Sequence, residues 1–262
     1  MKKDNKTKKQ HYVPKMYLKN FTFDGVNCYT KNRKGEINIQ DISDICKGNF
    51  IYELRDKNGK IINKNLIEDA FAKVENLFST FLIDLFSYLN KIQNNSKIIY
   101  SENTEREMLG CLYAFLILKN PANMMHTKDM VDEVYNIKLT NIEAENFSIQ
   151  NILILLKPLS KIMAEECDIT IYRNISKIPF ITASCPVVAT EKNNKECTYM
   201  PLSSKYLIEF TKKEPLDMKE DKLIEIDGYE VQQYNEMFYP EHRTNIKLRN
   251  YILISEKENV LK

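Results

Sequence analysis

The sequence predicts a single α+β domain, and three observations support this prediction. Apolar residues make up 43% of the 262 residues and charged residues 28%, so the chain can bury a full hydrophobic core. Segments with strand character come first, helical segments follow, and strand character returns near the C-terminus. A strict alternation of strands and helices, which would indicate a parallel α/β sheet, is missing. No internal repeat and no linker rich in glycine or serine divides the chain.

The N-terminal part predicts a basic tail followed by hairpins. Five lysines and one aspartate among the first ten residues predict a flexible basic tail at 1–10, ahead of a single domain at 11–262. A solvated tail and an arm that touches phosphate groups both fit this charge. Between residues 26 and 63, short alternating segments are separated by the turn-forming stretches KNRKGE and RDKNGK, which is typical of hairpin strands.

The central region predicts helices. From Leu66 to Leu89 apolar residues recur at steps of three and four, so this segment is predicted to form a long amphipathic helix. A second helix is predicted to end at Pro121, and its part at 111–118 is apolar on every side, as expected of a central core helix. A further helical pattern covers 123–135.

One more helical pattern, at 149–156, is expected to stop near Pro158 because proline breaks helices. After Cys167, short runs of β-branched and aromatic residues predict a C-terminal antiparallel sheet. These runs are DITIYRN, PFITA, PVVAT, TYMPL and KYLIEF. A late helix is predicted in DGYEVQQYNEMFY, and a terminal strand in NYILIS.

Several classes of protein are excluded by the composition. No two of the six glycines lie closer than ten residues, so the chain has no glycine-rich nucleotide-cofactor motif. The six cysteines form no C-x-x-C pair, so we expect reduced thiols and no structural zinc. The basic start does not lead into a signal peptide, and no apolar run approaches the roughly 18 residues of a membrane span. We therefore expect a cytoplasmic protein without a membrane partner.

The segment QHYVPKMYLKNF carries a recognisable signature. Its HYVP tetrapeptide at 11–14, followed by Tyr17, Leu18, Lys19 and Phe21, resembles the start of a bacterial family of unknown function with an N-terminal His-Tyr-Val-Pro signature. Later positions resemble that family in the same order over almost the whole chain. They are Glu68 and Glu75, Lys119 to Pro121, the strand FITASCPVV, Pro201 to Ser203, and Asn235.

One position departs from the family pattern. Where the family usually has an aspartate, this chain has Ser184, and Cys185 replaces an asparagine beside it. If the missing carboxylate is a metal ligand or a general base in the family, the chemistry of this member is altered. Ser184 still follows a strand and precedes Pro186, a place where active-site side chains often emerge; a structural strand end fits equally.

His11 and Tyr12 are the first candidate catalytic residues. The chain has three histidines, and His11 is the one within the signature. A neutral imidazole would serve as a general base or metal ligand, with Tyr12 orienting it or donating a hydrogen bond. The structural alternative is that both residues tether the entering chain to the sheet.

Glu68 and Glu75 are the candidate carboxylates. Seven residues apart on a helix, they face the same way but lie about 10.5 Å apart along the axis, too far to chelate one ion together. Each would face its own partner across a groove, for instance His11 or an arginine. A solvated face, or pairs with Lys73 and other cations, is the structural alternative.

Basic residues indicate where nucleic acid would bind. Lys119, at the end of the second helix, and Arg243, Lys247 and Arg249 near the C-terminus are the candidates for phosphate contacts. Solubility alone would also explain the C-terminal group. The carboxylates are compatible with a divalent metal ion, but the sequence identifies no cofactor.

Two functional hypotheses follow. In the first, the protein is a nuclease-like hydrolase of a bacterial defence or mobile-element system, with His11 as base or ligand and Glu68 or Glu75 as its carboxylate partner. In the second, the same residues are structural, and the protein is a binding or sensing module that acts through a protein partner. Convergence of His11, Glu68, Glu75 and Ser184 in one cleft would favour the enzyme.

Overall fold

The computed structural model describes residues 9–32, 34–100, 103–121, 131, 133–134, 136, 138–213, 220–239 and 251–254. Its helices are α1 (Lys15–Leu18), the 3-10 turn η1 (Lys19–Phe21), α2 (Leu66–Leu89), α3 (Asn103–Leu118), α6 (Asn141–Glu166) and α7 (Gly228–Glu236). Its N-terminal strands are β1 (Lys9–His11), β2 (Asn27–Asn32), β3 (Ile37–Asp41) and β4 (Lys47–Asn49). The later strands are β5 (Cys167–Asn174), β6 (Thr182–Ala183), β7 (Val188–Lys192), β8 (Lys195–Pro201), β9 (Tyr206–Lys212), β10 (Lys222–Ile226) and β11 (Tyr251–Ile254).

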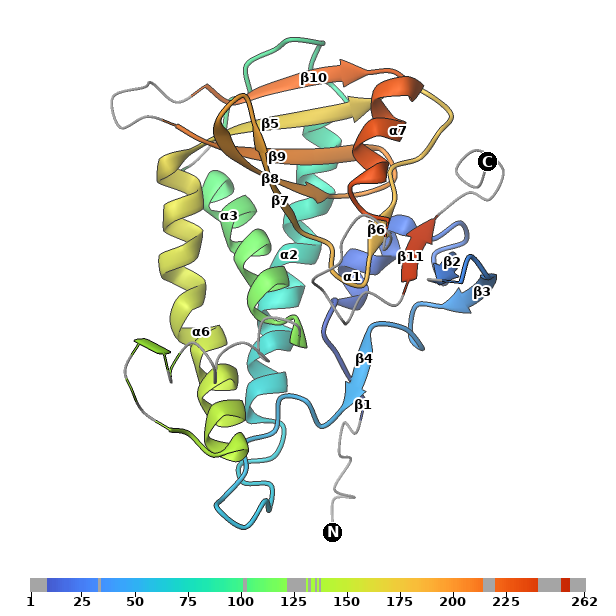
Figure 1. The fold of residues 1–262 in the computed structure, drawn as a ribbon. Helices are drawn as coiled ribbons and strands as arrows, with labels where there is room; N and C mark the ends of the chain where they lie inside the picture. Colours follow the sequence, from blue (N-terminus) through green and yellow to red (C-terminus); the bar gives the residue numbers. More distant parts are fainter. Residues whose placement is uncertain are drawn as a thin grey trace.

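The predicted α+β class is confirmed. A five-stranded sheet of order β10-β5-β9-β8-β7 is antiparallel except where β10 runs parallel to β5. Helices α2, α3 and α6 lie against one face of this sheet, and the short helix α7 packs on the other (Figure 1). Side chains alternate accordingly along β9, because successive residues of a strand point to opposite faces. Ile208 and Phe210 join the core on the helical side, whereas Leu207 joins the cluster under α7.

The N-terminal strands form two smaller sheets. The predicted hairpin β2–β3 is present, and Gly35 at φ +81° allows its turn. The second predicted hairpin is reduced to a single bridge between Arg55 and Ile61. The terminal strand β11 lies between β2 and β6 in a four-stranded sheet of order β3-β2-β11-β6, so it does not extend the C-terminal sheet.

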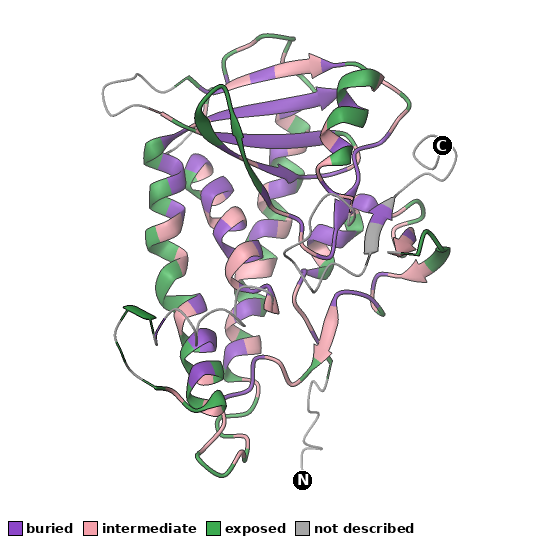
Figure 2. Cartoon of the chain, in the orientation of Figure 1, coloured by how far each residue is buried: buried purple, intermediate pink, exposed green. Residues whose placement is uncertain are grey.

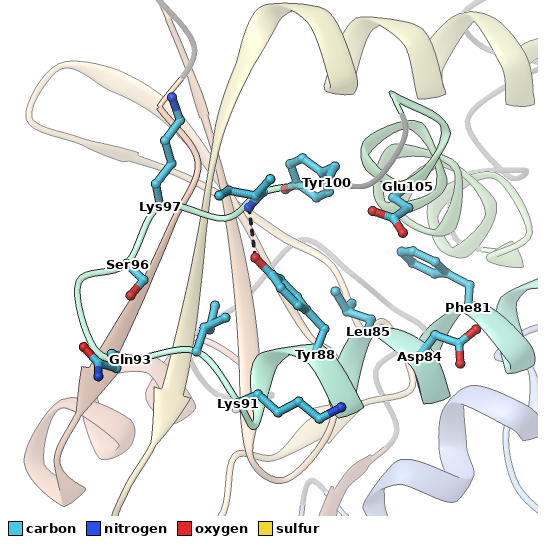
Figure 3. A pocket seen from close by; sticks show the side chains of 12 residues that line it. Phe81, Asp84, Leu85, Tyr88, Lys91, Gln93, Ser96, Lys97, Tyr100 and Glu105 are labelled. Carbon is cyan, nitrogen blue, oxygen red and sulfur yellow. Dashed lines mark hydrogen bonds between the residues drawn. The ribbon is translucent and has the colours of Figure 1, made fainter.

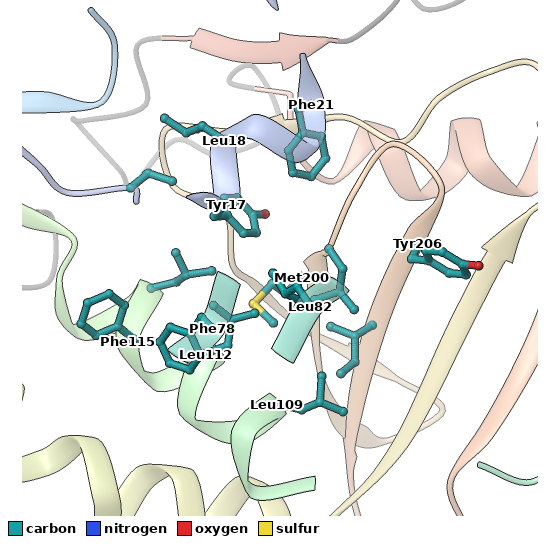
Figure 4. Packing of buried hydrophobic residues seen from close by; sticks show 14 of the residues in the cluster. Tyr17, Leu18, Phe21, Phe78, Leu82, Leu109, Leu112, Phe115, Met200 and Tyr206 are labelled. Carbon is teal, nitrogen blue, oxygen red and sulfur yellow. The ribbon is translucent and has the colours of Figure 1, made fainter. Parts of the chain in front are cut away.

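The main core lies where the signature segment meets the helical layer and the sheet. Figure 4 shows Tyr17 between Phe21 on one side and Phe78 and Leu82 of α2 on the other, with Phe115 of α3 near Phe78. All five side chains are buried. Buried residues continue along α3, which lies between α2 and α6 (Figure 2). The prediction that 111–118 belongs to the central core helix is therefore consistent with the structure.

Helices α3 and α6 approach each other closely at Gly110. A Cβ atom built on Gly110 would lie 2.5 Å from the carbonyl oxygen of Ser160 and 3.2 Å from the Met163 side chain. The Ser160 hydroxyl also donates a hydrogen bond of 2.8 Å to the carbonyl of Glu107. Only glycine fits between the two backbones here, and α6 is consequently fixed against the core helix.

The expected helix end near Pro158 is wrong, because α6 continues through Pro158 to Glu166. Pro158 and Ile154, the residue four positions earlier, are both exposed, so the proline ring lies on the solvent-facing side of the helix. Among the described helices, α6 alone is long and apolar enough to cross a membrane by length and composition, and 33% of that stretch is buried. Its close packing on α3 at Gly110 is that of a core helix.

Candidate functional site

The ladder between β1 and β4 positions His11. Gln10 pairs with Gly48 and His11 with Lys47 in an antiparallel register. The next residue, Tyr12, donates its backbone N–H to the carbonyl of Cys46 at 2.8 Å. The strand therefore begins at Lys9, inside the segment that was predicted to be a flexible tail. Burial of Gln10 within the domain gives the physical reason for this correction.

The half-buried His11 imidazole is neutral at pH 7. Burial, followed by the charge of Lys15, lowers its pKa from 6.5 to about 4, although a hydrogen bond with the backbone of Ile42 opposes the shift. The Nε2 atom is buried and has no hydrogen-bond partner among the residues that the structure describes. We conclude that Nδ1 carries the proton and donates to Ile42, so Nε2 carries a buried lone pair.

Lys119 lies at the centre of the site, just beyond the end of α3. Its side chain is fully buried, and its Nζ contacts the Glu75 carboxylate at 2.5 Å. The ammonium also lies 4.7 to 5.5 Å from the ring centres of Tyr52, Phe71 and Phe115, a favourable cation–π arrangement. The Tyr52 hydroxyl donates to the backbone carbonyl of Lys119.

Glu68 completes the group that we call the Lys119 cluster: His11, Tyr52, Glu68, Glu75 and Lys119. Burial raises the pKa of the Glu68 carboxyl, Lys119 partly offsets this shift, and Glu75 adds to it. The Glu68 Oε2 atom is buried and accepts no hydrogen bond from any described residue. Burial and the carboxylates of Glu68 and Glu75 also raise the pKa of Tyr52.

The Lys119 ammonium thus connects three other predicted residues, His11, Glu68 and Glu75. The charge of Lys119 acts on both His11 and Glu68, and Lys119 contacts Glu75 directly. The predicted partner of the Glu75 carboxylate across the groove is therefore Lys119. Full burial contradicts the expected role of Lys119 as a phosphate contact, because its ammonium is taken up by Glu75 and the three rings.

Ser184 lies next to the cluster through the backbone. Its carbonyl accepts a hydrogen bond of 3.0 Å from the Asn120 side chain, and Ser184 itself is 1% exposed. Among the other positions that resemble the family, Tyr17 bonds to Thr182 and to the carbonyl of Pro201. These positions hold α1 and the end of α3 to the sheets, which is a structural role.

Sequence reasoning missed a buried polar support beneath His11. The Gln10 amide donates to Glu53 at 3.0 Å and accepts from the backbone N–H of Tyr52 at 2.9 Å. Glu53 also accepts from the N–H of Asn65, which precedes α2 in a left-handed conformation at φ 60°. A charged residue inside the apolar run IYEL was the available signal, because buried charges need such partners.

The remaining candidates do not join the cluster. Arg243, Lys247 and Arg249 lie outside the described residues. Within the described ranges, no three His, Cys, Asp or Glu side chains come together as a set that could hold a metal ion. Tyr12 is half-buried beside His11, and its phenol adds to the electrostatic environment of Tyr52.

A separate hollow of about 660 Å³ lies at the other end of α2 (Figure 3). Tyr88, Tyr100 and Phe81 line it, and the Tyr88 hydroxyl accepts a hydrogen bond from the N–H of Ile99. None of the candidate residues lines this hollow. It therefore does not belong to the site around Lys119.

Comparison with protein families gives one match, to the family described as a protein of unknown function (DUF4238), over residues 9–246. This range includes every residue of the Lys119 cluster as well as Ser184. No curated protein and no solved structure matches the chain.

Proposed function

Since this chain belongs to the DUF4238 family, whose description names no activity, we propose its function from the Lys119 cluster: it is a nuclease-like hydrolase that cleaves phosphodiester bonds by general acid–base catalysis. The observation that carries the proposal is the buried Nε2 atom of His11, which has no hydrogen-bond partner in the described part of the chain. The charge of Lys119 acts on this imidazole and also on Glu68, whose protonation is favoured by burial. Two titratable groups whose environments shift their pKa values are typical of acid–base sites.

The proposed reaction assigns one proton to each group. Nε2 of His11 accepts a proton from water as the water oxygen attacks the phosphorus atom. The bond from phosphorus to the leaving oxygen breaks, and the protonated Glu68 carboxyl donates its proton to that oxygen. The products are a phosphomonoester and an alcohol, and transfer of the His11 proton back to Glu68 restores the starting state.

The charges around His11 favour an anionic substrate. Lys15, Lys119 and Lys47 each lower the pKa of the imidazole, so their positive charges all reach it. Lys15 is exposed at the start of α1, and Lys47 lies opposite His11 in the β1–β4 ladder. A phosphodiester near Nε2 would be attracted by these side chains. Lys119 would contribute through its field, because its ammonium is buried.

A binding module remains the second candidate function. The observation that favours it is the structural use of Tyr17, Asn120 and Asn235, which all resemble family positions and all anchor segments by hydrogen bonds. In that case the His11 N–H to Ile42 is a further anchor of this kind. The two functions differ in whether phosphodiester bonds are cleaved.

Incubation of the purified protein with labelled single-stranded RNA, single-stranded DNA and duplex DNA tests the proposal. We expect cleavage of at least one substrate in the presence of EDTA, because the proposed chemistry uses side chains only. Cleavage that requires added Mg²⁺ or Mn²⁺ would retain the nuclease but contradict this mechanism. Absence of cleavage of all three substrates from pH 5 to 9, with and without these ions, would contradict the proposed function.

A further inference from the structure

A cavity of about 560 Å³ lies between the segment that follows β4 and the first turns of α6. Its walls come from Asn49, Phe50, Ile51, Glu53, Arg55, Pro121, Asn141, Ala144, Glu145 and Ile149. The volume falls in the range of about 300 to 1,000 Å³ that is usual for small-molecule sites. It is large enough for one nucleoside.

Two wall residues connect this cavity to the proposed catalytic groups. Glu53 accepts the hydrogen bond from Gln10, the residue before His11. Pro121 follows the Lys119–Asn120 pair at the end of the core helix. The cavity therefore shares Glu53 with the hydrogen bonds beneath His11, and Pro121 with the segment that follows α3.

Phe50 is the unusual residue of the cavity wall. It has φ 54°, a left-handed conformation that is rare for an aromatic residue, and its side chain is half-buried. The chain around it is tightly folded, since a Cβ atom on Gly48 would lie 2.6 Å from the Ile51 side chain. Strained backbone of this kind persists where the structure fixes a side chain in place, often at ligand sites.

The polar groups of the cavity wall match a planar ring that carries both hydrogen-bond donors and acceptors. Asn49 and Asn141 supply amides, Arg55 a guanidinium, and Glu145 a carboxylate. Such mixed groups hydrogen-bond to base edges, while an aromatic face stacks on the ring. The carboxylates of Glu53 and Glu145 would repel a phosphate group inside the cavity, so the phosphate belongs outside it.

We propose that this cavity binds a nucleobase stacked on Phe50, namely the base of the nucleotide next to the phosphodiester that reaches His11. The proposal rests on the proposed function for its substrate class, nucleic acid with an unpaired base. It adds a specificity site that the catalytic groups do not require. A duplex would have to open before its base could enter, so single strands are the preferred substrates.

Direct binding of nucleotides tests the cavity without any need for catalysis. Calorimetric titrations would use AMP, GMP, CMP and UMP, with ribose 5-phosphate as the control that lacks a base. We expect at least one nucleotide to bind and ribose 5-phosphate not to bind. Phe50→Leu should weaken binding by about 5- to 150-fold, the effect of losing one stacked base, and Phe50→Tyr should preserve it. Phe23→Leu, at a phenylalanine that is 46% exposed elsewhere, is the matched control and should change nothing.

The possible results separate this inference from the proposed function. If nucleotides bind and Phe50→Leu weakens this binding, but no nucleic acid is cleaved, the base-binding cavity is supported and the proposed hydrolase activity is contradicted. Cleavage with an unchanged KM in Phe50→Leu, or equal binding of ribose 5-phosphate, would overturn the cavity. If Phe50→Leu does not fold, Ala144→Phe fills the cavity from α6 instead, and unchanged nucleotide binding by that variant would overturn the inference.

The shifted pKa values of Glu68 and His11 predict that these two residues affect the stability of the fold with opposite pH dependences. The folded pKa of Glu68 is raised, so its contribution to stability is present below pH 4.5 and is lost as the pH rises through the folded pKa. The folded pKa of His11 is lowered to about 4, so its contribution is present above pH 6.5 and is lost as the pH falls towards 4.

Glu68→Gln should therefore unfold at a higher urea concentration than the wild type at pH 8, and the difference should shrink at pH 4.5. The physical reason is that the amide avoids burying a carboxylate. Asp84→Asn, a carboxylate-to-amide change at an exposed residue farther along α2, is the control and should show no such pH-dependent gain. Equal pH profiles of Glu68→Gln and the wild type would contradict the raised pKa.

Discussion

Replacing His11 by alanine is expected to lower the rate of phosphodiester cleavage by about 10²- to 10⁴-fold, the usual effect of removing a general base. The reason is that the buried Nε2 lone pair, which no described residue engages in a hydrogen bond, is the proposed proton acceptor. Unfolding in urea should change little, because the variant loses one hydrogen bond to Ile42, worth about 1 kcal/mol. Single-turnover cleavage and urea unfolding are the two measurements.

His11→Asn distinguishes catalysis from tethering. The asparagine amide can donate to Ile42 in place of Nδ1–H, but it has no basic nitrogen. If His11 is a base, this variant is as inactive as alanine although its stability is restored. If His11 is only a tether, the variant recovers activity together with stability, which would contradict the catalytic assignment.

The second large effect is expected at the buried ion pair of Lys119 and Glu75. Lys119→Met should lower the free energy of unfolding by about 3 kcal/mol, because it leaves the Glu75 carboxylate without its partner. Glu75→Gln should cost more, up to about 5 kcal/mol. The Glu75 side chain is 23% exposed and can turn to water, whereas the Lys119 side chain is fully buried and cannot.

Chemical denaturation of the single and double variants measures this difference. The combination of Lys119→Met with Glu75→Gln should recover much of the loss, since no uncompensated charge stays buried. Lys161→Met is the control, because Lys161 and Glu165 form an exposed pair at 3.7 Å. Its effect should stay below about 1 kcal/mol. A loss at Lys119 as small as that at Lys161 would show that the ion pair does not stabilise the fold.

Local pattern was sufficient for the main elements. Helix α2 spans Leu66–Leu89 as its apolar period predicts, and β5 begins at Cys167, where the sequence turns to β-branched residues. Both depend on a periodicity that a segment carries by itself. The signature at His11 and the acidic residues Glu68 and Glu75 of α2 also identified three members of the site before their positions were known.

Only the tertiary structure determined how these residues are used. Lys119 is read from the sequence as a basic helix end that would meet phosphate, but packing encloses it among three aromatic rings and Glu75. Gln10 and Glu53 are buried partners because the β1–β4 ladder places Gln10 inside the domain. Pro158 is tolerated within α6 because that side of the helix faces solvent. Burial and pairing across distant segments depend on the whole fold, because a side chain's local sequence does not fix which other segments exclude water from it.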